Sequence, residues 1–151
     1  LVYIINELAP IHIDTLKTVL PKIYGKTRFS TTLQTTFEQD FEQGNLGTLF
    51  EFSDRWLYKS LGKIEFRKTG PYSHRRSFNE IDLDELKDAY LEILKNVKKI
   101  HISHLKKLIL EMVDYAQMSQ KMNQHFENSL LRLEAFPGIT IDKEIIEYQE
   151  D

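Results

Sequence analysis

Apolar residues recur every three to four positions in three segments of the first half of the chain. Residues 2–8, 14–24 and 29–41 each carry one apolar stripe, which is the pattern of a helix with one buried face. Asp14 is a suitable N-cap for the second segment, and Gly25 fits its end. A proline inside that segment is expected to bend or shorten it. The pattern therefore predicts three helices.

Shorter segments alternate between apolar and polar residues, which favours strands. Strands are predicted at 11–13, 48–52, 56–58 and 63–68. Helices followed by a hairpin, with a short strand before the second helix, form the element order of a winged helix. The hairpin and the loop that leaves it would be the wing of this fold.

The segment that begins at Ile11 occurs a second time, from Ile100. His12 falls on His101, an offset of 89 residues (101 − 12), and the register continues without a gap to Phe41. Such an internal repeat indicates a repeated structural unit. The second copy predicts helices at 82–95, 103–115 and 119–134, and strands at 100–102, 139–141 and 144–148.

These patterns predict a mainly α protein with small β-hairpins, an α+β fold of two tandem winged-helix units. The first unit would span residues 1–77, with a truncated N-terminal helix and a long basic wing. The second would span residues 78–151, with a short wing. Helix 82–95 is expected to join the two copies as a shared element.

Composition narrows the classes of function. The 151 residues include 20 Lys and Arg against 23 Asp and Glu, a net charge of −3, which argues against a uniformly basic surface but allows a local patch. The absence of cysteine excludes disulfides, thiolate zinc sites and cysteine nucleophiles. No apolar run reaches about 18 residues, so we expect a cytoplasmic protein without a membrane span. The opening residues lack an initiator Met and a signal peptide, and we expect the chain to begin inside a longer protein.

The sequence lacks the motifs of common catalytic sites. Gly-rich phosphate loops, a nucleophile elbow and an HExxH motif are all absent from it. His101 and His104 have a spacing that metal ligands can use, but His101 shares its repeat position with His12, which favours a role in the fold. The acidic residues of blocks 80–85 and 142–151 are typical of solvated faces. We therefore expect no catalysis, no cofactor and no metal in this chain.

Nucleic-acid binding has more support, because cations gather in the predicted wing and its exit loop. These residues are Lys59, Lys63, Arg67, Lys68, Arg75 and Arg76. Contacts of this kind to phosphates weaken steeply with salt. Helix 29–41 would be the recognition helix, and the polar and basic residues at its start are Lys26, Arg28, Ser30, Thr31 and Gln34. Acidic residues at the end of this helix would oppose deep insertion into DNA.

Other features of the sequence do not decide whether the partner is a nucleic acid or a protein. Lysines between Lys95 and Lys107 would extend the basic wing if both lay on one face. Trp56, Tyr58 and Phe66 could form a stacking platform for single strands, although core packing is the commoner role of such residues. Alternatively, the wing is a solvated surface that pairs with nearby acids, and the module docks onto proteins without touching nucleic acid.

Two short motifs carry a family resemblance. Pro10-Ile11-His12 opens the first repeat, and residues 81–86 read IDLDEL, with a charged wing between the two motifs. The chain resembles a C-terminal module of unknown function in large bacterial superfamily 1 DNA helicase-related proteins. The resemblance implies a non-catalytic accessory domain that contacts or positions DNA for helicase or nuclease domains of the parent chain. The ATPase motifs would then lie elsewhere in that chain.

Overall fold

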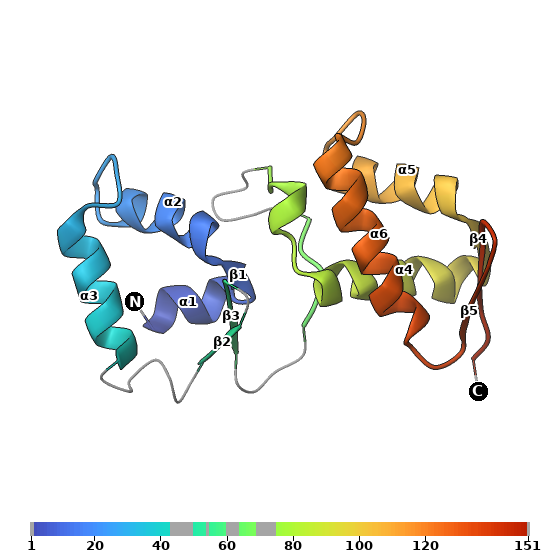
Figure 1. Ribbon diagram of the computed structural model, residues 1–151, viewed down its shortest axis with the longest axis horizontal. Helices are drawn as coiled ribbons and strands as arrows, with labels where there is room; N and C mark the ends of the chain where they lie inside the picture. The colour runs from blue at the N-terminus through green and yellow to red at the C-terminus, as the bar shows by residue number, and fades with distance from the viewer. Residues whose placement is uncertain (1, 43–49, 54, 60–63, 69–74, 151) are drawn as a thin grey trace. The chain divides into compact units, whose positions relative to one another are not determined.

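The computed structural model describes residues 2–42, 50–53, 55–59, 64–68 and 75–150 (Figure 1). The described chain is mainly helical and carries two small antiparallel sheets, which confirms the predicted α+β class. It forms two compact units, Leu1–Lys63 and Ile64–Asp151. None of the described helices is long and apolar enough to cross a membrane.

The first unit contains three helices and a three-stranded sheet. Its elements are α1 (Val2–Leu8), β1 (Ile11–His12), α2 (Ile13–Ile23), α3 (Thr31–Glu42), β2 (Phe50–Ser53) and β3 (Trp56–Lys59). The sheet has the order β1-β3-β2, with both pairs antiparallel. The apolar faces of the helices meet the sheet in a core that includes Ile5, Leu16, Leu20, Phe50 and Leu57.

The second unit repeats this arrangement around a longer first helix. Its elements are the 3-10 helix η2 (Phe78–Glu80), α4 (Leu83–Val97), β4 (Lys99–His101), α5 (Ile102–Met112), α6 (Gln120–Glu134), β5 (Ile139–Asp142) and β6 (Ile145–Tyr148). The sheet order is β4-β6-β5, again antiparallel. Asp82 is the N-cap of α4, since its carboxylate accepts the N–H groups of Asp84 and Glu85.

A buried polar contact sits inside this second core. The Tyr90 and Phe126 rings meet edge-on at 5.9 Å, and the Tyr90 hydroxyl lies 2.7 Å from Ser129 Oγ. Ser129 donates its single hydroxyl proton to the Phe126 carbonyl, so the Tyr90 hydroxyl is the donor toward Ser129. Burial raises the pKa of the Tyr90 phenol, and the hydrogen bond with Ser129 opposes this only in part.

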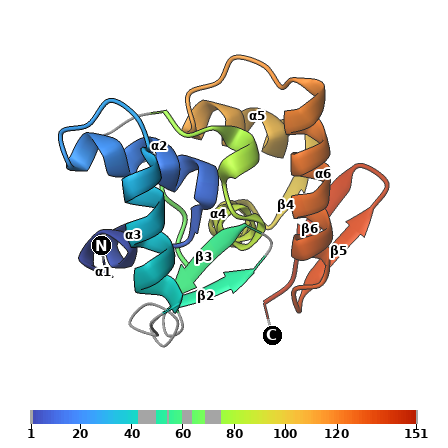
Figure 2. The same ribbon diagram turned by 60° about the vertical axis from the view of Figure 1, so that its left-hand side comes forward.

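The repeat extends further in the structure than the sequence comparison reached. Helices α2 and α5 start and end at positions that differ by 89 (102 − 13 and 112 − 23). Both sheets keep the same offset, because Ile11 pairs with Leu57 and Ile100 pairs with Ile146. The two hairpins, seen in Figure 2, are built from four-residue strands in both units. The hairpin strands are therefore equally long in the two units, where the sequence predicted one long and one short wing.

The histidines at the repeated position begin the second helix of each unit. His12 Nδ1 accepts the N–H of Asp14, and His101 Nδ1 accepts the N–H of Ser103, both at 3.2 Å. This confirms the structural role predicted for the pair. It also corrects the predicted N-cap Asp14, which lies inside the first turn of α2. The proline in α2 does not shorten that helix, which has 11 residues, as does α5.

The second half of the predicted wing belongs to the other unit. The alternation at 63–68 predicted a third wing strand, but the described residues 64–68 form none. The units divide between Lys63 and Ile64, earlier than the predicted division between Ser77 and Phe78. The physical reason is that this segment packs on α4, with Phe66 against the second core and its N–H bonded to Asp88 Oδ2 at 3.0 Å.

Candidate nucleic-acid interface

Helices α3 and α6 begin in the same way. Ser30 Oγ accepts the N–H of Leu33, and Ser119 Oγ accepts the N–H of Met122, at 3.3 and 3.2 Å. A serine N-cap satisfies one of the N–H groups that every helix start leaves without an intrahelical partner. Ser30, predicted as a nucleic-acid contact, is half-buried and used in this cap.

The outward face of α3 is polar and almost uncharged near its start. Thr31 and Gln34 are exposed there, as predicted for contact residues. The hydroxyl of Thr35 donates to the Thr31 carbonyl, and Gln34 Nε2 donates to Glu38 Oε1 at 2.8 Å. The hydroxyls and the Gln34 amide are groups that can also meet phosphates or base edges.

Two exposed cations stand just before this face. Lys26 and Arg28 lie in the turn between α2 and α3, and both side chains are exposed. The equivalent positions of the second unit (26 + 89 and 28 + 89) hold Tyr115 and Gln117. The pair of cations is therefore a property of the first unit and is not part of the repeated scaffold.

In the second unit, the equivalent helix borders a polar groove. A hollow of about 330 Å³ is lined by Asn79 of η2 and by Lys121, Gln124, His125 and Asn128 of α6. His125 Nε2 donates to the Ile81 carbonyl at 2.6 Å, which fixes its ring, and the ring meets Phe78 edge-on. The predicted set of contacts did not include these residues.

Two cations in the described part of the predicted basic wing contact a buried acid. Glu85 of α4 has a fully buried side chain and binds Arg76 Nη2 at 2.9 Å and Arg67 Nε at 3.2 Å. The backbone N–H of Arg67 also donates to the Glu85 carboxylate. The Arg76 side chain is only 9% exposed. Two of the predicted phosphate contacts are thus committed to a buried ion cluster.

Arg75 is also held by the second unit. Its guanidinium lies 4.4 Å from the centre of the Tyr115 ring, and Nη1 donates to the Asp114 carbonyl at 3.4 Å. The Tyr115 hydroxyl donates to the Arg76 carbonyl at 2.8 Å. Polar contacts with the second unit therefore anchor Arg67 on one side of residues 69–74, and Arg75 and Arg76 on the other.

The remaining predicted wing residues are distributed between the units. Lys59 is exposed at the end of β3, Lys68 is exposed in the second unit, and Lys63 lies outside the described residues. Of the aromatic residues, Trp56 packs edge-on against the His12 ring at 5.3 Å, while Phe66 packs in the second unit. A stacking platform of Trp56, Tyr58 and Phe66 on one sheet, the less favoured prediction, does not form.

The lysine cluster between residues 95 and 107 is largely paired within its own unit. Lys98 binds Glu150 at 3.1 Å, and Lys99 binds Glu147 at 3.3 Å. Lys106 donates to the Asn123 side chain and lies over the Phe126 ring. The two ion pairs neutralise Lys98 and Lys99, whereas Lys106 keeps its charge.

Comparison of the chain with protein-family models, with curated proteins and with solved structures gave no match in any of the three cases.

Proposed function

We propose that the chain is a non-catalytic tandem winged-helix module that contacts DNA, mainly through the start of α3. The observation that carries this proposal is the exposed polar face of α3 with Lys26 and Arg28 beside it. In the equivalent place, the second unit has neither cation. The difference between two copies of one scaffold is where a function added to that scaffold is expected.

Each part of this surface has a distinct chemical role. Lys26 and Arg28 neutralise backbone phosphates, which supplies affinity without sequence preference. Thr31 and Gln34 lie one and four residues beyond Ser30, so they sit on the face that enters a groove when a recognition helix docks by its N-terminal end. On α6, Lys121, Gln124 and Asn128 offer a second polar contact, since carboxamides can pair with adenine edges.

The wider context of this activity comes from the resemblance to DNA helicase-related proteins. We propose that the module positions DNA for ATP-driven or nuclease domains of a longer cytoplasmic chain. The sequence itself has no phosphate-binding loop, so the chemistry belongs to those domains.

Fluorescence anisotropy with a labelled DNA duplex, titrated at several salt concentrations, tests the proposal. The double variant Lys26→Glu/Arg28→Glu should bind weakly. Its slope of log affinity against log salt should be shallower than that of the parent by about 1.8, or about 0.9 for each lost phosphate contact. The control Lys17→Glu/Lys95→Glu has the same change of net charge on exposed residues of α2 and α4. Equal losses in both variants, or no binding by the parent at low salt, would show that α3 does not carry the contact.

A further inference from the structure

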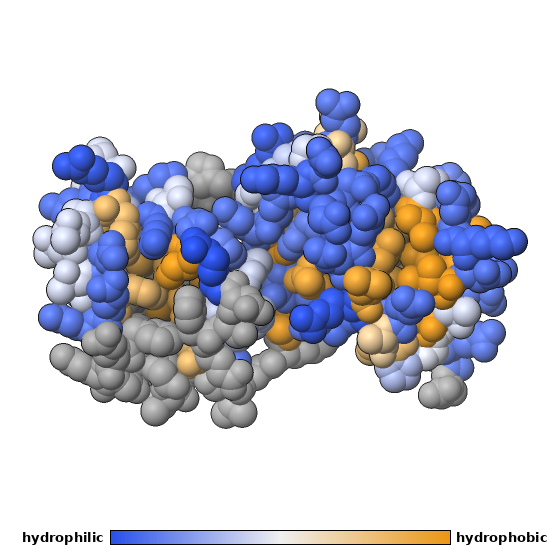
Figure 3. Space-filling view, in the orientation of Figure 1, coloured by the Kyte–Doolittle hydropathy of each residue, from blue (hydrophilic) through white to orange (hydrophobic). Residues whose placement is uncertain are grey.

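The turn that joins α2 to α3 carries an exposed aromatic ring among cations. Tyr24 is 49% exposed, and it is the one exposed aromatic residue among those whose burial the structure describes. Three exposed cations belong to the same turn, namely Lys22, Lys26 and Arg28. Among the ion pairs that join two described residues, none uses these three side chains. Figure 3 shows hydrophilic side chains over this turn, at the upper left of the view.

The end of α2 holds the Tyr24 ring in a defined place. Tyr24 is the C-cap of this helix, and its N–H donates to the Leu20 carbonyl at 3.2 Å. The N–H of Lys26 returns to the Pro21 carbonyl at 2.7 Å, which closes the turn. The backbone that carries the ring and the cations is therefore fixed before any ligand binds, so little order has to be imposed on it by binding.

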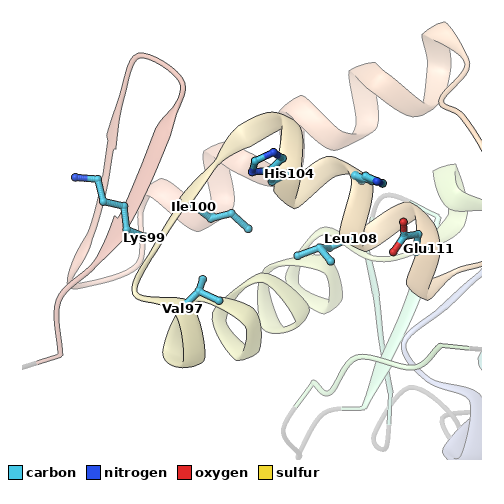
Figure 4. Close-up of a pocket in the computed structure, with 7 residues that line it drawn as sticks. Val97, Lys99, Ile100, His104, Leu108 and Glu111 are labelled. Carbon is cyan, nitrogen blue, oxygen red and sulfur yellow. The ribbon is translucent and has the colours of Figure 1, made fainter.

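The equivalent turn of the second unit lacks the exposed ring and the cations. Tyr24 corresponds to Val113, which is buried, and Lys22 corresponds to Glu111 (24 + 89 and 22 + 89). Figure 4 shows the Glu111 carboxylate on α5, near the end of that helix. The exposed ring and the positive charge are thus particular to the first unit.

The difference in charge extends along the chain on both sides of the turn. Residues 15–37 include four Lys and Arg and no Asp or Glu, a formal charge of +4 with histidine neutral. The equivalent residues 104–126 include three Lys, one Glu and one Asp, a formal charge of +1 (3 − 2). Local positive charge attracts anions, and an exposed aromatic ring offers a face on which a base can stack. A nucleotide has both the phosphate and the base that these two features suit.

We propose that this turn binds an unpaired nucleotide of the DNA that α3 contacts, so that the target is a duplex with a single-stranded extension. The base stacks on the Tyr24 ring, and the three cations of the turn neutralise the neighbouring phosphates. Bases inside a duplex are covered by their neighbours, so a protein ring stacks only on an unpaired or terminal base. The inference rests on the proposed function, because the turn leads directly into the helix assigned to the duplex.

Fluorescence anisotropy of the full chain with three labelled DNAs tests the proposal. They are a blunt duplex, the same duplex with a single-stranded extension, and the same duplex with an extension of equal length whose nucleotides lack bases. The chain should bind the base-bearing extension at least about fivefold more tightly than the abasic one, because the two carry the same phosphates and differ only in the surface for stacking. Tyr24→Ala should reduce this ratio of affinities to about one, and Tyr24→Trp should retain it.

Leu131→Ala is the matched control, since it removes an exposed apolar side chain from α6 and should keep the ratio. The inference is overturned by a ratio of about one in the unaltered chain, by a ratio that persists in folded Tyr24→Ala, or by an equal fall in Leu131→Ala. Circular dichroism melting identifies any variant that has lost its fold, and the unaltered chain tests the ratio without a variant. If the ratio is about one but Lys26→Glu/Arg28→Glu abolishes binding of the blunt duplex, the proposed function stands without this inference. Absence of binding to all three DNAs overturns both.

Discussion

At the residue scale, the buried carboxylate of Glu85 holds Arg67 and Arg76 on the second unit. Removing a carboxylate from water is costly unless cations and hydrogen bonds compensate, and here Arg67 and Arg76 both do so. In the sequence, Glu85 stands in a block of acids that is typical of a solvated helix start. Its burial depends on Arg67 and Arg76, which lie 18 and nine residues earlier, and no local sequence pattern predicts these contacts.

The histidines show the opposite case, in which a residue role could be predicted. His12 and His101 occupy equivalent repeat positions, and this alone favoured a part in the fold over a metal site. The structural role is confirmed, since both rings accept an N–H in the first helical turn, and His101 Nε2 faces Glu144 Oε2 at 3.0 Å. Comparison of two copies within one chain gave information that a single copy lacks.

Tyr90 supplies a prediction about pH. Its pKa is raised in the folded state, so the stability due to the neutral phenol is complete below the unfolded value of about 10 and is lost as the pH rises above it. At about pH 11 the wild type should have lost about 1.4 kcal/mol through this residue. Tyr90→Phe lacks the hydrogen bond to Ser129, which costs about 1 kcal/mol near neutral pH, but it is spared the alkaline loss.

Urea unfolding of both proteins at neutral and alkaline pH measures this effect. The stability advantage of the wild type over Tyr90→Phe should shrink, and then reverse, as the pH approaches about 11. Because the other tyrosines titrate in both proteins, only the difference between them is informative. If the difference in unfolding free energy between the two proteins stays constant with pH, burial does not raise the pKa of the Tyr90 phenol.

At the scale of elements, the helix pattern was a reliable guide, and the strand pattern failed at one segment. Residues 63–68 alternate as a strand does, yet Phe66 meets the second core and Arg67 meets Glu85. An extended segment that packs on a helix presents alternate side chains in the same way as a strand in a sheet, so alternation alone cannot distinguish them. The equal length of the two hairpins could have been predicted from the sequence. At the repeat offset of 89 residues, the apolar positions Phe50, Phe52 and Leu57 align with Ile139, Ile141 and Ile146.

The ends of α2 and α5 give a matched test within one molecule. Both helices end with the chain in the left-handed region, at Gly25 (φ 66°) and at its repeat equivalent Asp114 (φ 64°). The N–H of the next residue returns to the helix in both, from Lys26 to the Pro21 carbonyl and from Tyr115 to the Leu110 carbonyl. Glycine adopts this conformation without the steric cost that other residues incur.

Exchange of the two residues should therefore have opposite effects on stability. Asp114→Gly should raise the free energy of unfolding by about 0.5–1 kcal/mol, because relief of about 1–2 kcal/mol of strain exceeds the entropy that glycine adds to the unfolded chain. Gly25→Asp should lower it by a similar amount, and the cost should be confined to the backbone, since a Cβ at Gly25 meets nothing within 4 Å. Urea unfolding measures both changes. Changes of the same sign would contradict the shared geometry.

At the scale of the whole molecule, each unit has a buried core of its own, and the features proposed for function differ between them. The exposed cations beside α3, Lys26 and Arg28, occur in the first unit, and the equivalent positions of the second unit hold Tyr115 and Gln117. The repeat explains the architecture, whereas residues that break the repeat carry the proposed contact with DNA. Sequence reasoning located the repeat and placed Arg67, Arg75 and Arg76 in the first unit, whereas these side chains contact Glu85 and Tyr115 of the second unit.

Two fragments test this division directly. Fragment 64–151 keeps Phe66, Arg67 and Arg76 with Glu85, and it should unfold cooperatively in urea as an independent unit. Fragment 78–151, cut at the boundary that the sequence predicted, leaves Glu85 buried without its two arginines. Loss of the partners of a buried charge costs about 3–5 kcal/mol, so this shorter fragment should be less stable by that order or fail to fold.

The single substitution Glu85→Gln then separates the charge from the length of the chain. In fragment 78–151 it removes an anion that has no partner, so it should restore stability there. In fragment 64–151 it leaves two guanidinium groups without their anion and should lower stability. Opposite signs in the two fragments are the result that only the ion cluster predicts. The same sign in both would mean that Phe66 and the backbone contacts, rather than the arginines, hold this segment to the second unit.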